Sequence, residues 1–259
     1  MLSFVVPAYN EELELPATLA SIHASISHDV TAPSPQSSPS GRGGREALGE
    51  GTCDYEIIVV DDASTDHTAG IARDASAQVV SINRRQIAAA RNAGARVARG
   101  DILFFVDADT RINRQHVIGV IEALRAGYAG GSAQIAADGT IPRWGRVFLK
   151  IFCAFYFANR LGAGAFLFTT RENFDKVGGF DERLFIGEEV YFSLALRKLG
   201  RFKILREPVV TSGRKLRMYS ARQVFARFAG IILRGKRGAM SRERLEFWYD
   251  GRRETRSTS

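Results

Sequence analysis

Two aspartates, Asp107 and Asp109, are separated by one alanine directly after the apolar run 102–106. Their carboxylates can turn toward one point. Such hard oxygen ligands suit Mg²⁺ or Mn²⁺, which often take their remaining ligands from a substrate phosphate. Aspartate is also common in polar turns after strands, so the pair alone is weak evidence for a metal site. Further acidic residues at the same sheet edge would strengthen the metal interpretation considerably.

Two more apolar runs lead into acidic residues. The run 2–6 is followed by Glu11, and the run 55–60 is followed directly by Asp61 and Asp62. Each run is short and rich in β-branched residues, which predicts a buried strand. Helical spacing of apolar residues alternates with these runs and with a short strand pattern at 78–82; the helical segments are 11–26, 68–75, 87–99 and 113–126.

This alternation of strands and helices predicts a single α/β domain. Repeated βαβ units give a mainly parallel sheet with helices on both faces. In such folds ligands bind at the carboxyl ends of the strands. The acidic residues that follow the three runs should therefore meet at one edge of the sheet and form a site there.

The composition is that of a folded globular chain with a basic C-terminal region. Of 259 residues, 45% are hydrophobic and 25% are charged, and the net charge is +8. Residues 201–259 hold 16 basic and 5 acidic side chains, so an anionic ligand or surface is expected near this part. Two cysteines, no secretory signal and no apolar run of roughly 20 residues predict a cytoplasmic protein, and peripheral contact with the inner face of the membrane is the alternative.

Several common catalytic motifs are absent from the sequence. There is no G-x-G-x-x-G after the first strand and no G-x-x-x-x-G-K-[ST], which argues against a dinucleotide-binding fold and a P-loop. The G-x-S-x-G elbow of serine hydrolases is also missing. None of the four histidines lies in a metal-binding sequence context.

Six segments together resemble the family 2 glycosyltransferases of the GT-A fold. They are FVVPAYNEE at 4–12, IIVVDDASTD at 57–66, ARNAG at 90–94, FVDAD at 105–109, GGFDE at 178–182 and GEE at 187–189. Each segment alone is modest evidence, but their order and spacing over roughly residues 2–205 make the resemblance strong. It implies a GT-A-like fold that binds a nucleotide-diphospho-sugar donor together with Mg²⁺ or Mn²⁺.

The resemblance also implies roles for side chains on the donor side. Asp109 would coordinate the metal that bridges the diphosphate, and Asp107 would reach the ribose or the metal. Asp61 would accept a hydrogen bond from the base with Asp62 close by, although one of these two is equally suited to cap a helix. The other nucleotide-binding residues implied are Pro7, Tyr9, Glu11 and Arg91, and a salt bridge is the alternative for Arg91.

On the acceptor side, the resemblance implies a general base. Family members place an acidic pair at the start of a helix after the GGFDE segment, and here the pair is Glu188 and Glu189. Glu189 aligns with the base, where the family more often has aspartate, and would take the proton from the attacking acceptor hydroxyl. Inversion is implied as well, and the absence of a histidine beyond His116 agrees with it. The alternative is that both glutamates only favour a helix N-terminus electrostatically.

Four more predictions concern the domain boundaries and three further segments. The segment 211–215, TSGRK, resembles a loop that closes over the diphosphate in some family members, which assigns Arg214 and Lys215 to diphosphate binding. The glycosyltransferase domain is expected at 1–215 with a flexible insertion at about 28–52, followed by a basic helical extension and tail at 216–259. The apolar stretch 224–233 either lies on an anionic membrane or docks on the domain. The apolar helix at 146–160 either packs under the sheet or holds a hydrophobic acceptor tail.

The function expected is metal-dependent transfer of a sugar from a nucleotide-diphospho-sugar to a hydroxyl of a sugar, lipid-linked or small-molecule acceptor. A nucleotidyltransferase is one rival, but it would show a Gly- and Lys/Arg-rich loop after the first strand, and residues 7–11 contain none. A non-catalytic binder of anionic ligands or nucleic acid is the other rival. The mildly acidic first 200 residues argue against nucleic acid as a partner.

Overall fold

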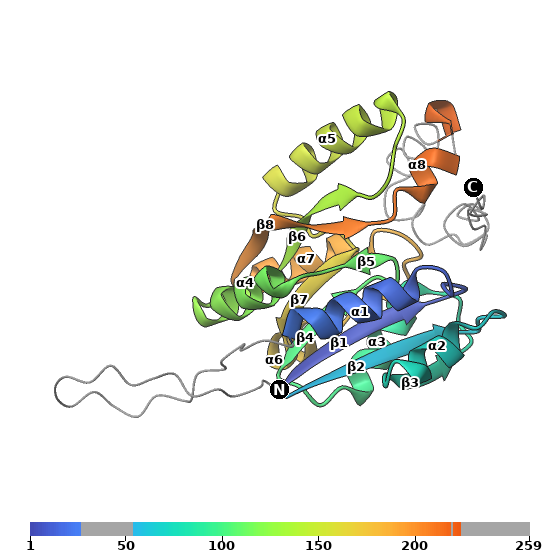
Figure 1. The fold of residues 1–259 in the computed structure, drawn as a ribbon. Helices are drawn as coiled ribbons and strands as arrows, with labels where there is room; N and C mark the ends of the chain where they lie inside the picture. The colour runs from blue at the N-terminus through green and yellow to red at the C-terminus, as the bar shows by residue number, and fades with distance from the viewer. Residues whose placement is uncertain (27–53, 219, 224–259) are drawn as a thin grey trace, which may run out of the picture.

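The computed structural model describes residues 1–26, 54–218 and 220–223. These residues form one α/β domain around an eight-stranded sheet, whose strand order is β3-β2-β1-β4-β7-β6-β8-β5 (Figure 1). The predicted insertion at 28–52 and the stretch at 224–233, with the tail that follows it, lie outside the described residues. The expectations for these segments therefore stay predictions.

The first half of the sheet is parallel, as the sequence predicts. Its strands are β1 (Leu2–Ala8), β2 (Tyr55–Asp62), β3 (Gln78–Ile82) and β4 (Ile102–Val106). β1 is buried along its whole length and β2 along nearly all of it, which explains their continuous apolar sequences. The register pairs Ala8 with Asp61. The loops that follow β1 and β2 therefore begin side by side at the carboxyl edge.

The second half of the sheet contains antiparallel pairs that the sequence did not predict. β7 (Phe166–Thr170) is antiparallel to β4 and to β6 (Tyr128–Ala137), β5 (Thr110–Arg111) is antiparallel to β8 (Arg201–Thr211), and β6 and β8 are parallel. Because β7 runs against β4, the loop before β7 lies beside the end of β4. The Asp107 amide donates to the Ala165 carbonyl oxygen across 3.1 Å there.

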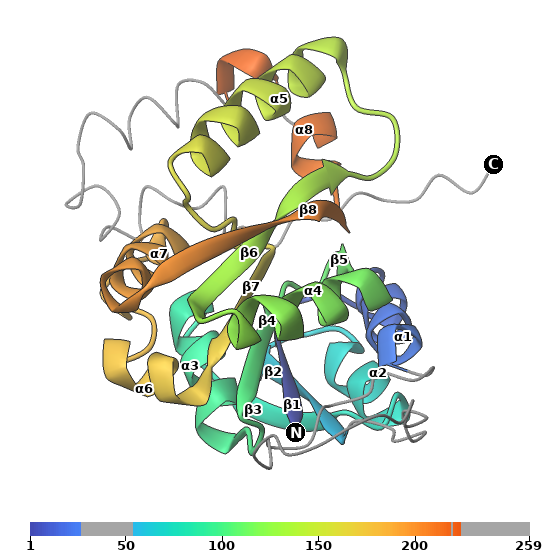
Figure 2. The same ribbon diagram turned by 90° about the vertical axis from the view of Figure 1, so that its left-hand side faces the viewer.

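Helices cover both faces of the sheet, which confirms that prediction (Figure 2). One face carries α1 (Leu15–Ile26), α2 (Thr68–Asp74) and α4 (Arg114–Arg125), and the other carries α3 (Ile87–Val97), α6 (Arg171–Val177) and α7 (Glu188–Leu199). The alternation of side chains along β1 accounts for the two cores. Phe4 and Val6 enter one of them, and Val5 enters the other.

Two more helices lie beyond β6 and β8 at one end of the molecule, namely α5 (Arg143–Ala158) and the short α8 (Arg214–Met218) (Figure 1). α5 exposes Val147, Ile151 and Phe155, so this face does not pack under the sheet. The TSGRK segment is not a loop throughout, because Thr211 ends β8 and Arg214 begins α8. None of the described helices is both long and apolar enough to cross a membrane.

Candidate active site

Asp107 and Asp109 follow β4 at the carboxyl edge of the sheet, as the sequence predicts. Asp107 Oδ1 accepts a hydrogen bond from Arg91 Nη2 across 2.9 Å. Burial raises the pKa of the Asp107 carboxyl to about 6, although the Arg91 guanidinium opposes this shift. Neutralisation by a cation would therefore favour the ionised form of Asp107 at this position.

Arg91 joins three separate segments of the chain at this edge. Its side chain is 1% exposed, and Nη1 donates to Glu188 Oε1 across 2.8 Å. Nη2 donates both to Asp107 and to the Gly164 carbonyl oxygen, the latter across 2.8 Å. This buried geometry favours the ion-pair interpretation of Arg91 over direct contact with a nucleotide. The pairing reaches beyond its own helix, to the end of β4 and the start of α7.

Glu188 and Glu189 begin α7, yet they have different surroundings. Gly187 precedes them with a φ of 77°, a left-handed conformation that favours glycine. Glu188 is 4% exposed and is held by Arg91. Glu189 is partly exposed, and its Oε1 accepts a hydrogen bond from the Tyr156 hydroxyl across 3.0 Å. The arrangement leaves Glu189 as the member of the pair that can receive a proton.

The Glu189 carboxyl is set up to hold a proton near neutral pH. Burial, and then the negative charge of Glu188, raises its pKa to about 8. The hydrogen bond from Tyr156 and the charge of Arg91 act in the opposite direction. A carboxylate with a pKa close to the working pH is well matched to general base catalysis.

Glu189 belongs to the same site as Arg91 and its two carboxylate partners, because Gly164 lies between Glu189 and Arg91. A Cβ added at Gly164 would lie 3.3 Å from Arg91 Nη2 and 3.8 Å from Glu189 Cγ. Asp107, Arg91 and the two glutamates are thus assembled from β4, α3 and α7 around the loop before β7. Neither Gly164 nor Tyr156 was predicted as a site residue. The run of small residues at 162–165 could have indicated a close approach at Gly164. No sequence pattern distinguishes Tyr156 from the other residues of its apolar helix.

Asp62 organises the backbone before α3. Its carboxylate accepts hydrogen bonds from the backbone amides of Arg84, Arg85 and Gln86, each across 2.7 Å. Gln86 is the N-cap of α3. These amides precede α3, so Asp62 holds the loop before the helix and does not cap the helix itself. This structural role leaves Asp61 as the better candidate for a nucleotide.

The remaining predicted nucleotide residues lie around the ends of β1 and β2. Asp61 is largely buried, and its Oδ1 accepts from the Ser64 amide across 3.1 Å. The Arg85 guanidinium carbon lies 3.6 Å from the centroid of the Tyr9 ring. Pro7 is a buried residue of β1, opposite Val60. Pro7 thus supports this edge from within β1, Asp61 lies near the end of β2, and Tyr9 follows β1.

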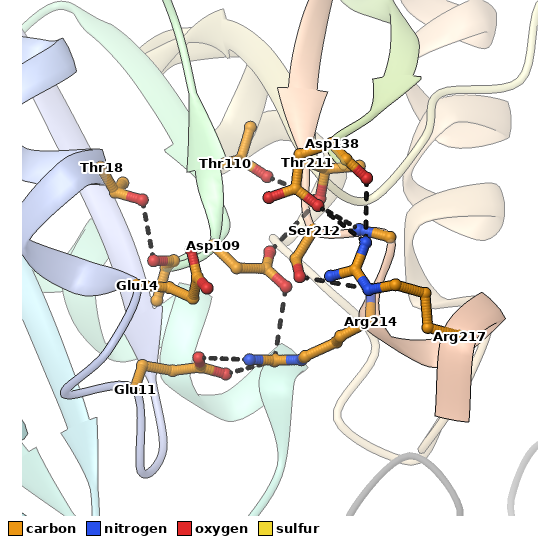
Figure 3. A network of polar contacts seen from close by, with 12 residues as sticks. Glu11, Glu14, Thr18, Asp109, Thr110, Asp138, Thr211, Ser212, Arg214 and Arg217 are labelled. Carbon is orange, nitrogen blue, oxygen red and sulfur yellow. Dashed lines mark hydrogen bonds and ion pairs between the residues drawn. The ribbon is translucent and has the colours of Figure 1, made fainter. Parts of the chain in front are cut away.

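Arg214 bridges Glu11 and Asp109 from the opposite side of the site (Figure 3). Its two terminal nitrogens donate to the Glu11 carboxylate across 2.8 and 2.6 Å, and Nη2 lies 3.4 Å from Asp109 Oδ2. These carboxylates raise the pKa of the guanidinium against the effect of its burial. Lys215 follows Arg214 in α8, and the structure describes its backbone alone.

Asp138, at the end of β6, holds the start of α8 in this position (Figure 3). Its Oδ1 accepts from the Gly213 amide across 2.8 Å and from Arg217 Nη1 across 3.3 Å. Thr211 lies next to this anchor and donates from Oγ1 to Asp109 Oδ1 across 3.3 Å. Asp138 was not predicted as a site residue, because nothing in the sequence pairs the end of β6 with the end of β8. Thr211 was predicted only as part of the TSGRK segment.

The two aspartates after β4 fit a hard divalent cation. Asp107 Oδ2 has no hydrogen-bond partner among the described residues, and the contacts to Asp109 are long, at 3.3 and 3.4 Å. In the described part of the chain, no three His, Cys, Asp or Glu side chains gather around one point. A cation here would therefore take further ligands from substrate oxygens and water, as Mg²⁺ commonly does.

Comparison with known proteins identifies the chain. The sequence model described as "Glycosyl transferase family 2" matches residues 3–180. The chain belongs to glycosyltransferase family 2. The resemblance expected from the six segments is therefore confirmed. Membership in this family favours a glycosyltransferase over the two rivals, a nucleotidyltransferase and a non-catalytic binder.

Three relatives illustrate what this family 2 glycosyltransferase is similar to. The undecaprenyl-phosphate 4-deoxy-4-formamido-L-arabinose transferase of Aeromonas hydrophila is 33% identical over 135 residues, which are 49% of this chain and 35% of that relative. The mannosyltransferase PcManGT of Pyrobaculum calidifontis, solved with GDP-Man and Mn²⁺, has a TM-score of 0.60 at 19% identity, covering 96% of this chain and 69% of that one. Glucosyl-3-phosphoglycerate synthase of Mycobacterium tuberculosis, solved with Mg²⁺ and UDP, gives 0.58 at 20% identity over 90% and 76% of the two chains.

The chain spans about a third of the length of the curated relatives that it matches. The two solved structures are below 25% identical to it, so they show the fold alone. The GT-A fold of nucleotide-sugar transferases predicted from the sequence is thereby confirmed.

Proposed function

We propose that this family 2 glycosyltransferase moves a sugar from a nucleotide-diphospho-sugar to an acceptor hydroxyl with inversion, using Mg²⁺ or Mn²⁺ and Glu189 as the general base. One observation carries the proposal. Arg91 bonds Asp107, on the donor side, and Glu188, the neighbour of the base, across 2.9 and 2.8 Å. A single buried guanidinium thus holds the donor carboxylate and the acidic pair of α7 at a fixed separation.

On the donor side, Tyr9, Glu11 and Asp61 would line the nucleoside, and Pro7 would support this place from β1. Asp107 and Asp109 would hold the cation, whose chemistry is to neutralise the negative charge that develops on the departing diphosphate. Arg214 already lies against Asp109 and Glu11. It is therefore within reach of an anionic group bound there and would add a charge-assisted hydrogen bond to it.

On the acceptor side, Glu189 would take the proton of the attacking hydroxyl. The acceptor oxygen forms a bond to the anomeric carbon, the bond from that carbon to the diphosphate oxygen breaks, and the proton passes to the Glu189 carboxylate. Tyr156 orients this carboxylate through the hydrogen bond to Oε1. Glu188 is engaged by Arg91 and would act as a positioning residue.

The solved relatives support this assignment by analogy of fold. One was solved with GDP-Man and Mn²⁺, and another with Mg²⁺ and UDP. The decisive experiment is a thermal-shift panel with UDP-glucose, UDP-GlcNAc and GDP-mannose, each with and without Mn²⁺. We expect at least one donor to raise the melting temperature only when Mn²⁺ is present, and Asp109→Ala to lose that response. An unchanged response of Asp109→Ala would contradict the metal assignment.

A further inference from the structure

The outer face of α5 carries a row of exposed apolar side chains. Val147, Ile151 and Phe155 are 58, 65 and 68% exposed, and they are four residues apart. Residues at this spacing lie in line along one side of a helix. Scattered exposed apolar residues are ordinary on a soluble protein, but a continuous row on one helix marks an interaction surface.

A basic row runs beside the apolar row on the same helix. Arg143, Arg146 and Lys150 are exposed and share one side of α5, at spacings of three and four residues. No acidic residue occurs between Asp138 and Glu172, so nothing in this stretch of the chain offsets their charge. The outer face of α5 is therefore half apolar and half cationic, which is the pattern of a helix that lies in a lipid interface.

The opposite face of α5 contacts the proposed general base. Tyr156 follows Phe155 directly in the chain but turns inward, where its hydroxyl donates to Glu189 Oε1 across 3.0 Å. One helix thus has the exposed apolar row on one side and the acceptor end of the site on the other. Whatever covers the outer face of α5 lies about one helix diameter, roughly 10 Å, from the position of the acceptor.

We propose that the outer face of α5 lies on an anionic phospholipid surface and that the acceptor is anchored in the same surface. The apolar row would enter the boundary between headgroups and acyl chains, and the basic row would attract anionic headgroups. The docking of α5 stands on the exposed face alone. The lipid-anchored acceptor rests on the proposed function, because it requires Glu189 to be the base.

A second copy of the chain fits this face less well. Pairing two copies through α5 would bring their basic rows close together, and α5 itself has no acidic residue to balance them. An anionic bilayer offers complementary charge beside an apolar layer. Both rows are then matched at once.

Co-sedimentation of the full chain with vesicles tests the docking. The vesicles are phosphatidylcholine with or without phosphatidylglycerol, at low and high salt. We expect the wild type to bind the phosphatidylglycerol vesicles, with binding weakened by salt. The double variant Ile151→Ser/Phe155→Ser should bind these vesicles at least about tenfold more weakly than the wild type. The triple variant Arg143→Gln/Arg146→Gln/Lys150→Gln should lose the preference for phosphatidylglycerol.

Val97→Ser is the matched control, because Val97 is 38% exposed on α3, away from α5. It should bind as the wild type does, and circular dichroism melts should show all variants folded. Equal vesicle binding by wild type and Ile151→Ser/Phe155→Ser would overturn the proposal. So would no binding by the wild type together with a dimer, seen by light scattering, that the double variant loses.

Titration with nucleotide sugars and Mn²⁺ in the absence of vesicles separates this proposal from the proposed function. If the vesicle results are as expected but no donor binds, the proposed function fails and the docking of α5 stands. If donors bind and vesicles do not, the docking fails and the donor site stands. For the acceptor, a donor-competent enzyme that transfers to a soluble sugar at the same rate with and without vesicles would overturn the lipid anchor.

Discussion

Arg214 and Glu11 form a bidentate ion pair, with Nη1 2.8 Å and Nη2 2.6 Å from the two carboxylate oxygens, although they are 203 residues apart in the chain. The pair joins the loop after the first strand to the start of α8 across the donor side of the site (Figure 3). The same guanidinium lies 3.4 Å from Asp109. Arg214 therefore connects a proposed nucleotide residue to a proposed metal ligand.

Replacing Arg214 by alanine should weaken the binding of nucleoside diphosphates selectively. The guanidinium would pair with the diphosphate, so we expect the Kd of UDP or GDP with Mn²⁺ to rise about tenfold or more, whereas that of the matching nucleoside should change little. Calorimetric titration measures both. Lys176→Gln on α6 is the control, because its cation pairs with the exposed Glu172 one turn earlier in the same helix. An equal loss of affinity for the nucleoside would show that Arg214 supports the whole pocket instead.

Arg91→Ala should destabilise the fold strongly. It would leave the buried Glu188 and the partly buried Asp107 without their common partner, and removing one partner of a buried ion pair costs about 3–5 kcal/mol. Urea denaturation gives the free energy of unfolding. Arg91→Ala/Glu188→Gln should recover part of the loss because one of the unpaired charges is gone. If the urea midpoint of Arg91→Ala equals that of the wild type, the guanidinium does not hold these carboxylates.

Much of the fold could be predicted because its first half obeys local rules. β1, β2 and β4 are buried parallel strands, and such strands have continuous apolar sequences that are easy to recognise. β6 was missed because its sequence, YAGGSAQIAA, is rich in Gly, Ala and Ser, which do not favour strands. Gly131 shows why this strand needs a small residue: a Cβ there would lie 2.3 Å from the Lys203 carbonyl oxygen and from the Phe168 ring. The neighbouring strands β7 and β8 therefore require glycine at this position. Local strand propensity cannot show this requirement, because it comes from residues far away in the sequence.

The site was predictable where motifs end strands and unpredictable where segments meet in space. Asp107 and Asp109 at the end of β4 and the acidic pair at the start of α7 could be placed from sequence patterns. The position of Arg91 between them depends on β7 running antiparallel to β4, which no local pattern shows. Tyr156 was indistinguishable from a core residue of an apolar helix, because its partner Glu189 is 33 residues away.

Asp61 and Asp62 should separate into a binding role and a structural role. Asp62→Ala removes the acceptor of three backbone amides and should lower the free energy of unfolding by about 1–3 kcal/mol while leaving nucleotide affinity within about twofold. Asp61→Ala should do the reverse, with a smaller stability loss and weaker uridine or guanosine binding. Parallel denaturation and titration experiments check both. Strong loss of nucleotide affinity in folded Asp62→Ala would restore Asp62 to the nucleotide-binding set.

The pH profile of transfer should report Glu189 and its contact with Tyr156. The base must be ionised, so kcat/KM should rise with pH as Glu189 loses its proton near its pKa of about 8. The Tyr156 hydroxyl stabilises the ionised carboxylate, so Tyr156→Phe should raise this pKa and move the rising limb to higher pH. We expect a clear shift of the rising limb along the pH axis and only a small change in kcat/KM on the high-pH plateau. A shift to lower pH would mean that the hydrogen bond favours the protonated form.

Burial of Glu189 also has a consequence for stability. The raised pKa means that the folded chain binds this proton more tightly than the unfolded chain, whose value is near 4.5. The free energy of unfolding should therefore fall as pH rises from about 4.5 to 8, because the folded state must give up the extra proton. Glu189→Gln removes this dependence and should be the more stable protein at pH 8.5, by on the order of 1–3 kcal/mol. Denaturation of both proteins at pH 5.5 and 8.5 gives the comparison, and equal slopes would contradict it.

The most direct test of the central claim measures, in one set of samples, donor binding and nucleoside diphosphate release by wild type and Glu189→Gln. The donor is the nucleotide sugar selected by the thermal-shift panel, with Mn²⁺ and a membrane extract as the source of acceptor. The account predicts that Glu189→Gln binds the donor within about twofold of the wild type but releases diphosphate at least about 100-fold more slowly. Release at the wild-type rate by Glu189→Gln, with donor binding intact, would contradict it.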